Sequence, residues 1–223
     1  MARAPFDLGE EAPMRVRGVS FLRGKPAGFR PPRCCEGSSM ALPMHVLFVC
    51  HANMCRSALA EGLAKKLAEE RSLPEKILFR SSGLAAEPGR GAMPQAIKVA
   101  AQYGVDLTTH QTTPLTFGVA DWADYMVAAT RNQKRELIAR LPVLRPRIYT
   151  FAEFVGEMTG RRPRWRDILD PVGGSEHDYQ RCARLIYESL VSVFDALSGV
   201  QPRERSFLER LFRSRQPTRG FPF

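Results

Sequence analysis

The apolar run at residues 45–50, followed at once by a polar loop and a helical pattern, constrains the fold most. The run is short and rich in β-forming residues, which is typical of a strand buried on both faces. In residues 57–70, Leu and Ala recur at helical spacing, while Lys and Glu occupy the other positions. The sequence therefore predicts a strand, a tight loop and a helix in direct succession.

Three more strands and three more helices are predicted downstream. The strands cover residues 77–81, 125–129 and 147–151, and the helices cover residues 94–103, 130–140 and 175–197. Thr130 is the expected N-cap of its helix, and Ser175 with Asp178 forms a capping-box pattern. A polar, arginine-rich loop is expected from residue 156 to residue 170. Because strands that alternate with helices form parallel sheets, we predict an α/β fold: a small doubly wound, four-stranded parallel sheet with helices on both faces.

The formal net charge of +10 is concentrated toward the two ends of the chain. Residues 1–43 show no sustained hydrophobic period and are punctuated by Gly, Pro and Arg, so we predict a disordered or loosely ordered extension. Residues 44–200 are expected to form the folded domain, and residues 201–223 a basic tail. Basic tails can bind nucleic acid or anionic lipid, but a solvated appendage is the simpler interpretation, and no obligatory nucleic-acid partner is expected.

The sequence predicts a cytoplasmic protein. It contains no apolar run of the roughly 18 residues that a membrane helix needs, and its first residues lack the apolar segment of a secretory signal. It has 5 cysteines, and an odd number argues for free thiols rather than a disulfide framework.

The loop between the first strand and the first helix carries the candidate chemistry. A loop of this length can turn its backbone N–H groups toward one anion, at the positive end of the following helix. Arg56 can grip two oxygens of a phosphoryl group, and this field favours the nucleophilic thiolate of Cys50. Asn53 tolerates the left-handed backbone of a tight loop, and Ser57 can donate a hydrogen bond to the thiolate. The predicted phosphate-binding residues are His51, Ala52, Asn53, Met54, Cys55, Arg56 and Ser57.

A thiolate that attacks phosphorus needs an acid to protonate the leaving oxygen. Asp170 is the preferred candidate, since it precedes Pro171 and a glycine pair near the start of the last helix. Asp167, three residues earlier, is the competing candidate.

Residues 44–199 resemble the low-molecular-weight protein-tyrosine phosphatases of the bacterial type. The matching features are the strand that leads into Cys-x5-Arg-Ser, the Ser-Ser-Gly after the second strand, and Asp170-Pro171. The resemblance implies that Cys50 is the nucleophile, that Arg56 binds phosphate, and that Asp170 is the general acid and then the general base. It also implies that Cys55 can form a reversible disulfide with Cys50, which would make the enzyme redox-sensitive. The implied function is hydrolysis of phosphotyrosine proteins through a phosphocysteine intermediate, with no cofactor or metal.

Three alternatives stay open. The first alternative is a protein-arginine phosphatase on the same fold. By resemblance, such an enzyme would have Thr in the loop where this chain has Met54. Because Met54 is bulky and apolar, it favours the tyrosine phosphatases. An arsenate reductase needs further relay thiols, but no cysteine lies between Cys55 and Cys182, and Cys182 falls on the apolar stripe of the last helix. A non-catalytic phosphate-binding module would not require both Cys50 and Asp170.

Two further features of the sequence concern charged residues. The four histidines show no metal-ligand spacing, and His110 is expected at the surface of a Thr-rich connector. Residues 161–166 read Arg-Arg-Pro-Arg-Trp-Arg. Because this stretch is expected to flank the acid loop, we interpret it as a positive region that attracts acidic phosphopeptides rather than as a nucleic-acid patch.

Overall fold

The computed structural model describes residues 43–73 and 76–198 of the chain. In this part the strands are β1 (Met44–Cys50), β2 (Ile77–Gly83), β3 (Tyr125–Ala128) and β4 (Ile148–Thr150). They form one parallel sheet in the order β2-β1-β3-β4. The predicted extension at residues 1–43 and the tail at residues 201–223 lie outside the described residues, apart from Pro43, and both stay predictions.

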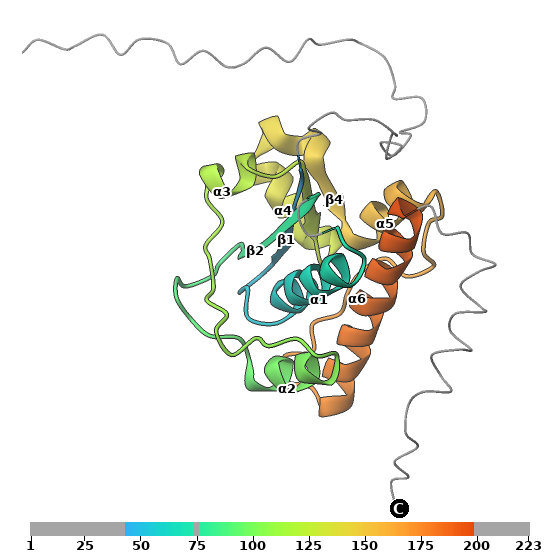
Figure 1. Ribbon diagram of the computed structural model, residues 1–223. Coiled ribbons are helices and arrows are strands. Elements are labelled where there is room, and N and C mark those ends of the chain that lie inside the picture. The colour runs from blue at the N-terminus through green and yellow to red at the C-terminus, as the bar shows by residue number, and fades with distance from the viewer. Residues whose placement is uncertain (1–42, 74–75, 199–223) are drawn as a thin grey trace, which may run out of the picture. The chain divides into compact units, whose positions relative to one another are not determined.

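Helices cover both faces of the sheet, as predicted (Figure 1). Side chains of β1 alternate between two cores. Val46 and Phe48 point into the core shared with α1 (Arg56–Glu70), α2 (Pro94–Gln102), α5 (Phe151–Thr159) and α6 (Glu176–Leu197). Leu47 and Val49 point into the core shared with α3 (Phe117–Asp121), α4 (Arg131–Arg140) and the 3₁₀ helix η1 (Pro142–Arg147). Because both faces are buried, the first strand has no polar alternation.

Two of the predicted caps are present. The Thr130 side chain accepts a hydrogen bond from the backbone of Gln133 at the start of α4. The Asp178 carboxylate accepts hydrogen bonds from the backbone N–H and the hydroxyl of Ser175 at the start of α6. The capping box thus fixes where the longest described helix begins.

The expected loop at residues 156–170 is wrong in its first part, because α5 runs from Phe151 to Thr159. A capping box between Thr150 and Glu153 starts this helix directly after β4, and Gly160, with φ 69°, ends it. The sequence predicts Phe151 in the strand because its aromatic ring continues the β-forming run of residues 148–150. It instead packs against Phe48, with ring centroids 5.7 Å apart.

Within the described residues, no helix is both long and apolar enough to cross a bilayer. The cytoplasmic location stays a prediction.

Candidate active site

Cys50 is the last residue of β1, and it is 3% exposed. Its Sγ lies 2.9 Å from the Ser57 Oγ. The N-terminus of α1, which begins at Arg56, faces the loop that follows Cys50. Because the helix end carries partial positive charge and the Ser57 hydroxyl has a proton to donate, this environment stabilises negative charge on the sulfur.

Asn53 holds the loop in shape from inside. It is fully buried and has a left-handed backbone, with φ 58°. Its Nδ2 donates to the Ser57 Oγ at 2.9 Å and to the Ser81 Oγ at 2.8 Å, and its Oδ1 accepts from the Thr113 N–H at 2.8 Å. Each of these buried polar groups would cost about 1–3 kcal/mol if it lost its partner, so the network fixes the loop geometry.

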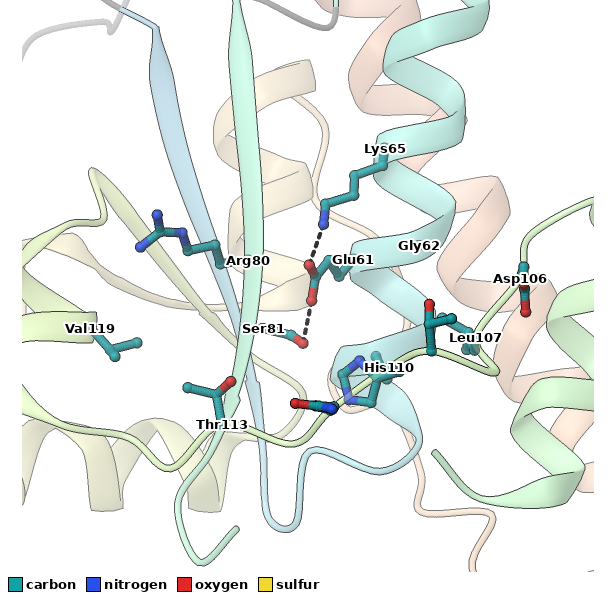
Figure 2. Close-up of a pocket in the computed structure, with 13 residues that line it drawn as sticks. Glu61, Gly62, Lys65, Arg80, Ser81, Asp106, Leu107, His110, Thr113 and Val119 are labelled. Carbon is teal, nitrogen blue, oxygen red and sulfur yellow. Dashed lines mark hydrogen bonds and ion pairs between the residues drawn. The ribbon is translucent and has the colours of Figure 1, made fainter. Parts of the chain in front are cut away.

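The network continues from the loop to an open cavity. The Ser81 hydroxyl donates to the Glu61 carboxylate at 2.5 Å, and Lys65 pairs with the same carboxylate at 2.5 Å. These side chains line a cavity of about 490 Å³ (Figure 2). The lining includes none of the three residues predicted to be catalytic. The cavity therefore lies beside the hydrogen-bond network that holds the loop in shape, and not on the side of the loop that is predicted to bind phosphate.

Gly83, at the end of β2, lies against the same loop. A Cβ at this position would come within 2.7 Å of the His51 carbonyl oxygen and 2.9 Å of the Ala52 carbonyl carbon. Such a clash would displace the loop backbone. The Ser-Ser-Gly sequence forms the end of β2 rather than following it, and its glycine is required by close packing, since only glycine leaves room for the loop.

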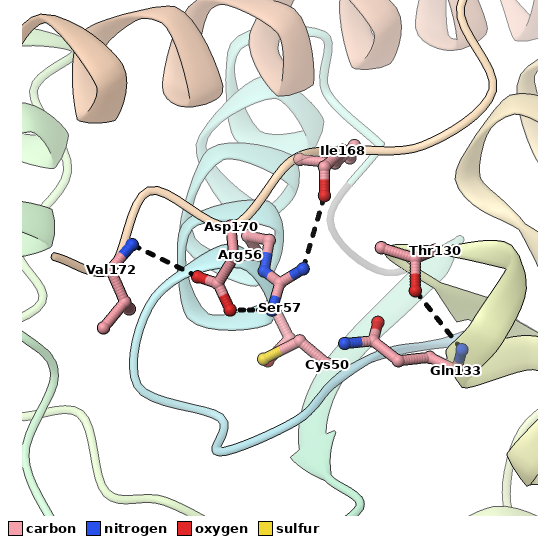
Figure 3. A network of polar contacts seen from close by, with 8 residues as sticks. All are labelled: Cys50, Arg56, Ser57, Thr130, Gln133, Ile168, Asp170 and Val172. Atoms are coloured by element: carbon pink, nitrogen blue, oxygen red, sulfur yellow. Dashed lines mark hydrogen bonds and ion pairs between the residues drawn. The ribbon is translucent and has the colours of Figure 1, made fainter. Parts of the chain in front are cut away.

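Arg56 is 5% exposed at the first turn of α1. One of its Nη atoms donates to the Ile168 carbonyl at 3.3 Å, and the other pairs with the Asp170 carboxylate (Figure 3). The buried Nε has no hydrogen-bond partner among the described residues. This N–H is free to donate to a bound oxyanion.

Asp170 and Asp167 have different environments. The Asp170 side chain is 48% exposed and contacts Arg56. Asp167 accepts three hydrogen bonds from Arg131, two of them from the guanidinium. Partial burial raises the pKa of Asp167, but the hydrogen bonds from Arg131 outweigh this effect and lower it overall. Asp167 is thus held as a carboxylate away from Arg56, whereas Asp170 lies beside the loop.

The remaining loop residues differ in exposure. His51 is exposed, Ala52 and Met54 are half-buried, and Cys55 is buried. The structure thus brings Cys50, Arg56, Ser57 and Asp170 together around one loop.

His110 is not a plain surface residue, contrary to the sequence-based expectation. Its ring Nε2 lies 2.8 Å from the Asn53 carbonyl oxygen. Because a carbonyl can only accept, the Nε2–H donates and braces the loop from outside. These residues are 57 positions apart, so no local pattern in the sequence could have revealed the contact.

Sequence reasoning also missed Gln133 as a residue of the site. It is 8% exposed in the first turn of α4, and its buried Oε1 has no partner among the described residues. Figure 3 shows its carboxamide extending from α4 toward Cys50. A buried glutamine at the carboxyl edge of the sheet could have been suspected from its position just after the predicted third strand.

Cys55 and Cys182 are buried thiols. Burial raises the pKa of Cys55 well above its usual range, and it raises the pKa of Cys182 to about 12. Both therefore stay protonated at neutral pH, and both are free rather than disulfide-bonded. The buried position expected for Cys182 is confirmed. The reversible disulfide between Cys50 and Cys55 stays a prediction.

One family model matches most of this chain. The family model described as low molecular weight phosphotyrosine protein phosphatase matches residues 45–201. The chain is 33% identical over 138 residues to the protein-arginine-phosphatase of Bacillus subtilis, covering 62% of this chain and 86% of that protein. It is 31% identical over 146 residues to the low molecular weight protein-tyrosine-phosphatase PtpB of Staphylococcus haemolyticus, covering 65% and 94%.

One similar solved structure contains a phosphorylated residue in its active site. The chain resembles a cysteine-to-serine mutant of YwlE arginine phosphatase with a phosphorylated active-site serine, at 30% identity and a TM-score of 0.62. The match covers 72% of this chain and 99% of that structure.

Proposed function

The chain belongs to the low molecular weight protein-tyrosine phosphatase family, and on this basis we propose that it removes phosphoryl groups from proteins through a covalent phosphocysteine on Cys50. One observation carries the residue assignment. The Cys50 Sγ, at the end of β1, lies 2.9 Å from the hydroxyl of Ser57, and the neighbouring Arg56 at the start of α1 pairs with Asp170. No cofactor enters the proposed reaction.

In the first step the Cys50 thiolate attacks phosphorus. The S–P bond forms as the bond to the leaving oxygen breaks. Arg56 binds two phosphoryl oxygens through Nε and one Nη, and it stabilises the charge that develops on them. The Asp170 carboxylate is half-exposed and carries one negative charge, so a phosphoryl dianion that accepts two parallel N–H groups displaces it from Arg56. The displaced, half-exposed Asp170 carboxylate takes up a proton from solvent, and Asp170 donates this proton to the leaving oxygen as the bond to phosphorus breaks.

In the second step water hydrolyses the phosphocysteine. The Asp170 carboxylate takes a proton from the water as the O–P bond forms and the S–P bond breaks. The Cys50 sulfur leaves as a thiolate, which the Ser57 hydroxyl stabilises. Inorganic phosphate departs, and Asp170 is again protonated for the next turnover.

Phosphotyrosine is the substrate class that we propose, with phosphoarginine as the second candidate. Half-buried Met54 supports the first, as the sequence indicates. Two observations favour the second: the similarity to protein-arginine phosphatases, and the absence of an aromatic residue directly after Asp170-Pro171. The side chains exposed beside Asp170 are aliphatic, namely Leu169 and Val172.

The two candidates differ in a measurable ratio. We expect the chain to have a higher kcat/KM for a phosphotyrosine peptide than for a phosphoarginine peptide of the same flanking sequence. Release of phosphate from both peptides would be measured with reduced protein. A higher kcat/KM for phosphoarginine would assign the chain to the second candidate, and turnover of neither would overturn the proposed function.

The acid can be identified by leaving-group dependence. We expect Asp170→Ala to slow turnover of a phenyl phosphate with a poor leaving group by about 100-fold, and that of a nitrophenyl phosphate much less, because only the former needs protonation. Asp167→Ala is the matched control, since it removes a carboxylate of the same segment that is tied to Arg131. Leaving-group sensitivity in the Asp167 variant alone would show that the acid has been misassigned.

A further inference from the structure

Residues 160–166, between α5 and the acid-bearing segment, contain four arginines and no acidic residue. We call this set the basic loop: Arg161, Arg162, Arg164 and Arg166. The proposed chemistry uses none of these side chains.

The guanidinium groups of the basic loop are exposed and uncommitted. All four residues are exposed, and none of the four side chains forms a hydrogen bond or an ion pair with the described residues. Arg131, by contrast, is committed to Asp167. Arg166 also interacts electrostatically with Asp167, but this carboxylate is already bonded to Arg131. The four adjacent cations therefore keep an excess of positive charge, and an acidic partner would lower their electrostatic energy.

The basic loop is attached to the domain at both ends. Gly160 ends α5, and the Thr159 hydroxyl accepts a hydrogen bond from the Arg161 N–H at 3.2 Å. The Trp165 ring packs on Phe151, with centroids 6.2 Å apart. The backbone that carries the four arginines is therefore fixed at both ends of the basic loop.

The next residues tie the basic loop to the mouth of the active site. Asp167 binds Arg131 at the start of α4, and the Ile168 N–H donates to the Ala129 carbonyl at 2.9 Å. The Ile168 carbonyl in turn accepts from Arg56. Arg166 precedes Asp170 by four residues, so their Cα atoms are at most about 14 Å apart. An extended peptide spans that distance with about four residues.

The packing of Trp165 favours an acidic protein segment over a nucleic acid as the partner of the basic loop. Proteins that bind single-stranded nucleic acid with basic segments stack bases on exposed aromatic rings. Trp165, the aromatic residue of this segment, is partly buried against the core instead. The exposed arginines fit carboxylates, which they can bind through two parallel N–H groups.

We propose that the basic loop is a docking site for acidic residues of the protein substrate, within about four residues of the phosphorylated side chain. This proposal rests on the proposed function. It adds a specificity determinant outside the phosphate-binding loop, which selects phosphorylation sites in acidic segments.

The test compares two charge-reversal variants of the full chain. R164E/R166E reverses two charges in the basic loop. K76E/R145E reverses two exposed charges at the amino-terminal ends of the strands, opposite to the end that carries Cys50, and it is matched in net charge. Lys76 directly precedes β2, and Arg145 lies in η1 before β4. Each variant is assayed on a nitrophenyl phosphate and on two phosphopeptides that share one phosphorylated residue. One peptide has Glu three and four residues away on each side, and the other has Ser there.

For R164E/R166E we expect about a tenfold lower kcat/KM on the acidic peptide at low salt, with little change on the serine peptide or on nitrophenyl phosphate. The loss should shrink as salt screens the charges. K76E/R145E should match the wild type on all three substrates. An equal loss in both variants, an equal loss on both peptides, or a wild-type enzyme with no preference for the acidic peptide would overturn the docking site.

Further measurements distinguish the different reasons for which the docking proposal could fail. R164Q/R166Q should show a smaller loss of the same kind, and equal melting temperatures of all variants exclude misfolding as its cause. Binding of the unphosphorylated acidic peptide and of a single-stranded oligonucleotide would be measured by fluorescence anisotropy. Preference for the oligonucleotide would overturn the proposal in favour of a nucleic-acid site. No turnover of nitrophenyl phosphate by the wild type would instead contradict the proposed function.

Discussion

Replacing Cys50 with alanine is expected to reduce turnover of every phosphorylated substrate by at least about a thousandfold. The substitution removes the sulfur that attacks phosphorus, but it leaves the loop backbone and Arg56 in place. A phosphate analogue such as vanadate or a phosphonate should therefore still bind, although vanadate will lose its bond to sulfur. Steady-state assays check the loss of turnover, and a competition binding measurement checks that the phosphate analogue still binds.

Two other cysteine variants complete this experiment. Cys50→Ser leaves a hydroxyl that we expect to accept a phosphoryl group at most once, because an alkoxide leaves phosphorus far less readily than a thiolate. It should stall rather than turn over. Cys182→Ser, the matched control, changes a buried thiol on α6 and should keep most activity. Activity of the Cys50→Ala variant above a few per cent of wild type would remove Cys50 from the mechanism.

Arg56→Lys is expected to lower kcat by about a hundredfold or more and to weaken oxyanion binding as well. The lysine ammonium keeps the charge but cannot donate two parallel hydrogen bonds to the phosphoryl group. It also cannot replace both the contact with the Ile168 carbonyl and the contact with Asp170. Arg56→Ala should be at least as impaired, so the lysine should give no substantial rescue.

The matched control for this prediction is Arg131→Lys. Arg131 also pairs with an aspartate of the acid-bearing segment, but it is 55% exposed and points to Asp167. Its replacement should change kcat less than about fivefold, since an exposed ion pair stabilises by about 1 kcal/mol or less. Near-wild-type kcat and oxyanion affinity in Arg56→Lys would show that charge alone suffices and that the bidentate contact is not used.

Elements with a strong local signal could be predicted from the sequence. The strand that ends at Cys50 is apolar throughout because its two faces enter two different cores. The caps at Thr130 and Ser175 mark helix starts that the structure confirms. The sequence analysis did not predict α5, the helix after β4, because the aromatic residue at its start favours a strand. Thr150 and Glu153 nevertheless have the spacing of a capping box, which marks the start of a helix.

The site was predictable only in part. Cys50, Asn53, Arg56 and Ser57 lie within residues 50–57, which end β1, form the tight loop and begin α1, so local geometry was enough to group them. The contact of His110 with Asn53 depends on how distant segments pack, which no local pattern encodes. The sequence favours Asp170 over Asp167 by its position before Pro171, and the bonding of Asp167 to Arg131, which the sequence does not place, supports the same choice.

The most direct test of the central claim is to trap the phosphorylated enzyme. Wild-type protein would be quenched in acid during turnover of a nitrophenyl phosphate, digested, and sequenced by mass spectrometry. We predict one added phosphoryl group on Cys50 within the first turnover, and none in Cys50→Ala. A phosphoryl group on another residue, or continued turnover with no phosphorylated enzyme at any quench time, would contradict the account.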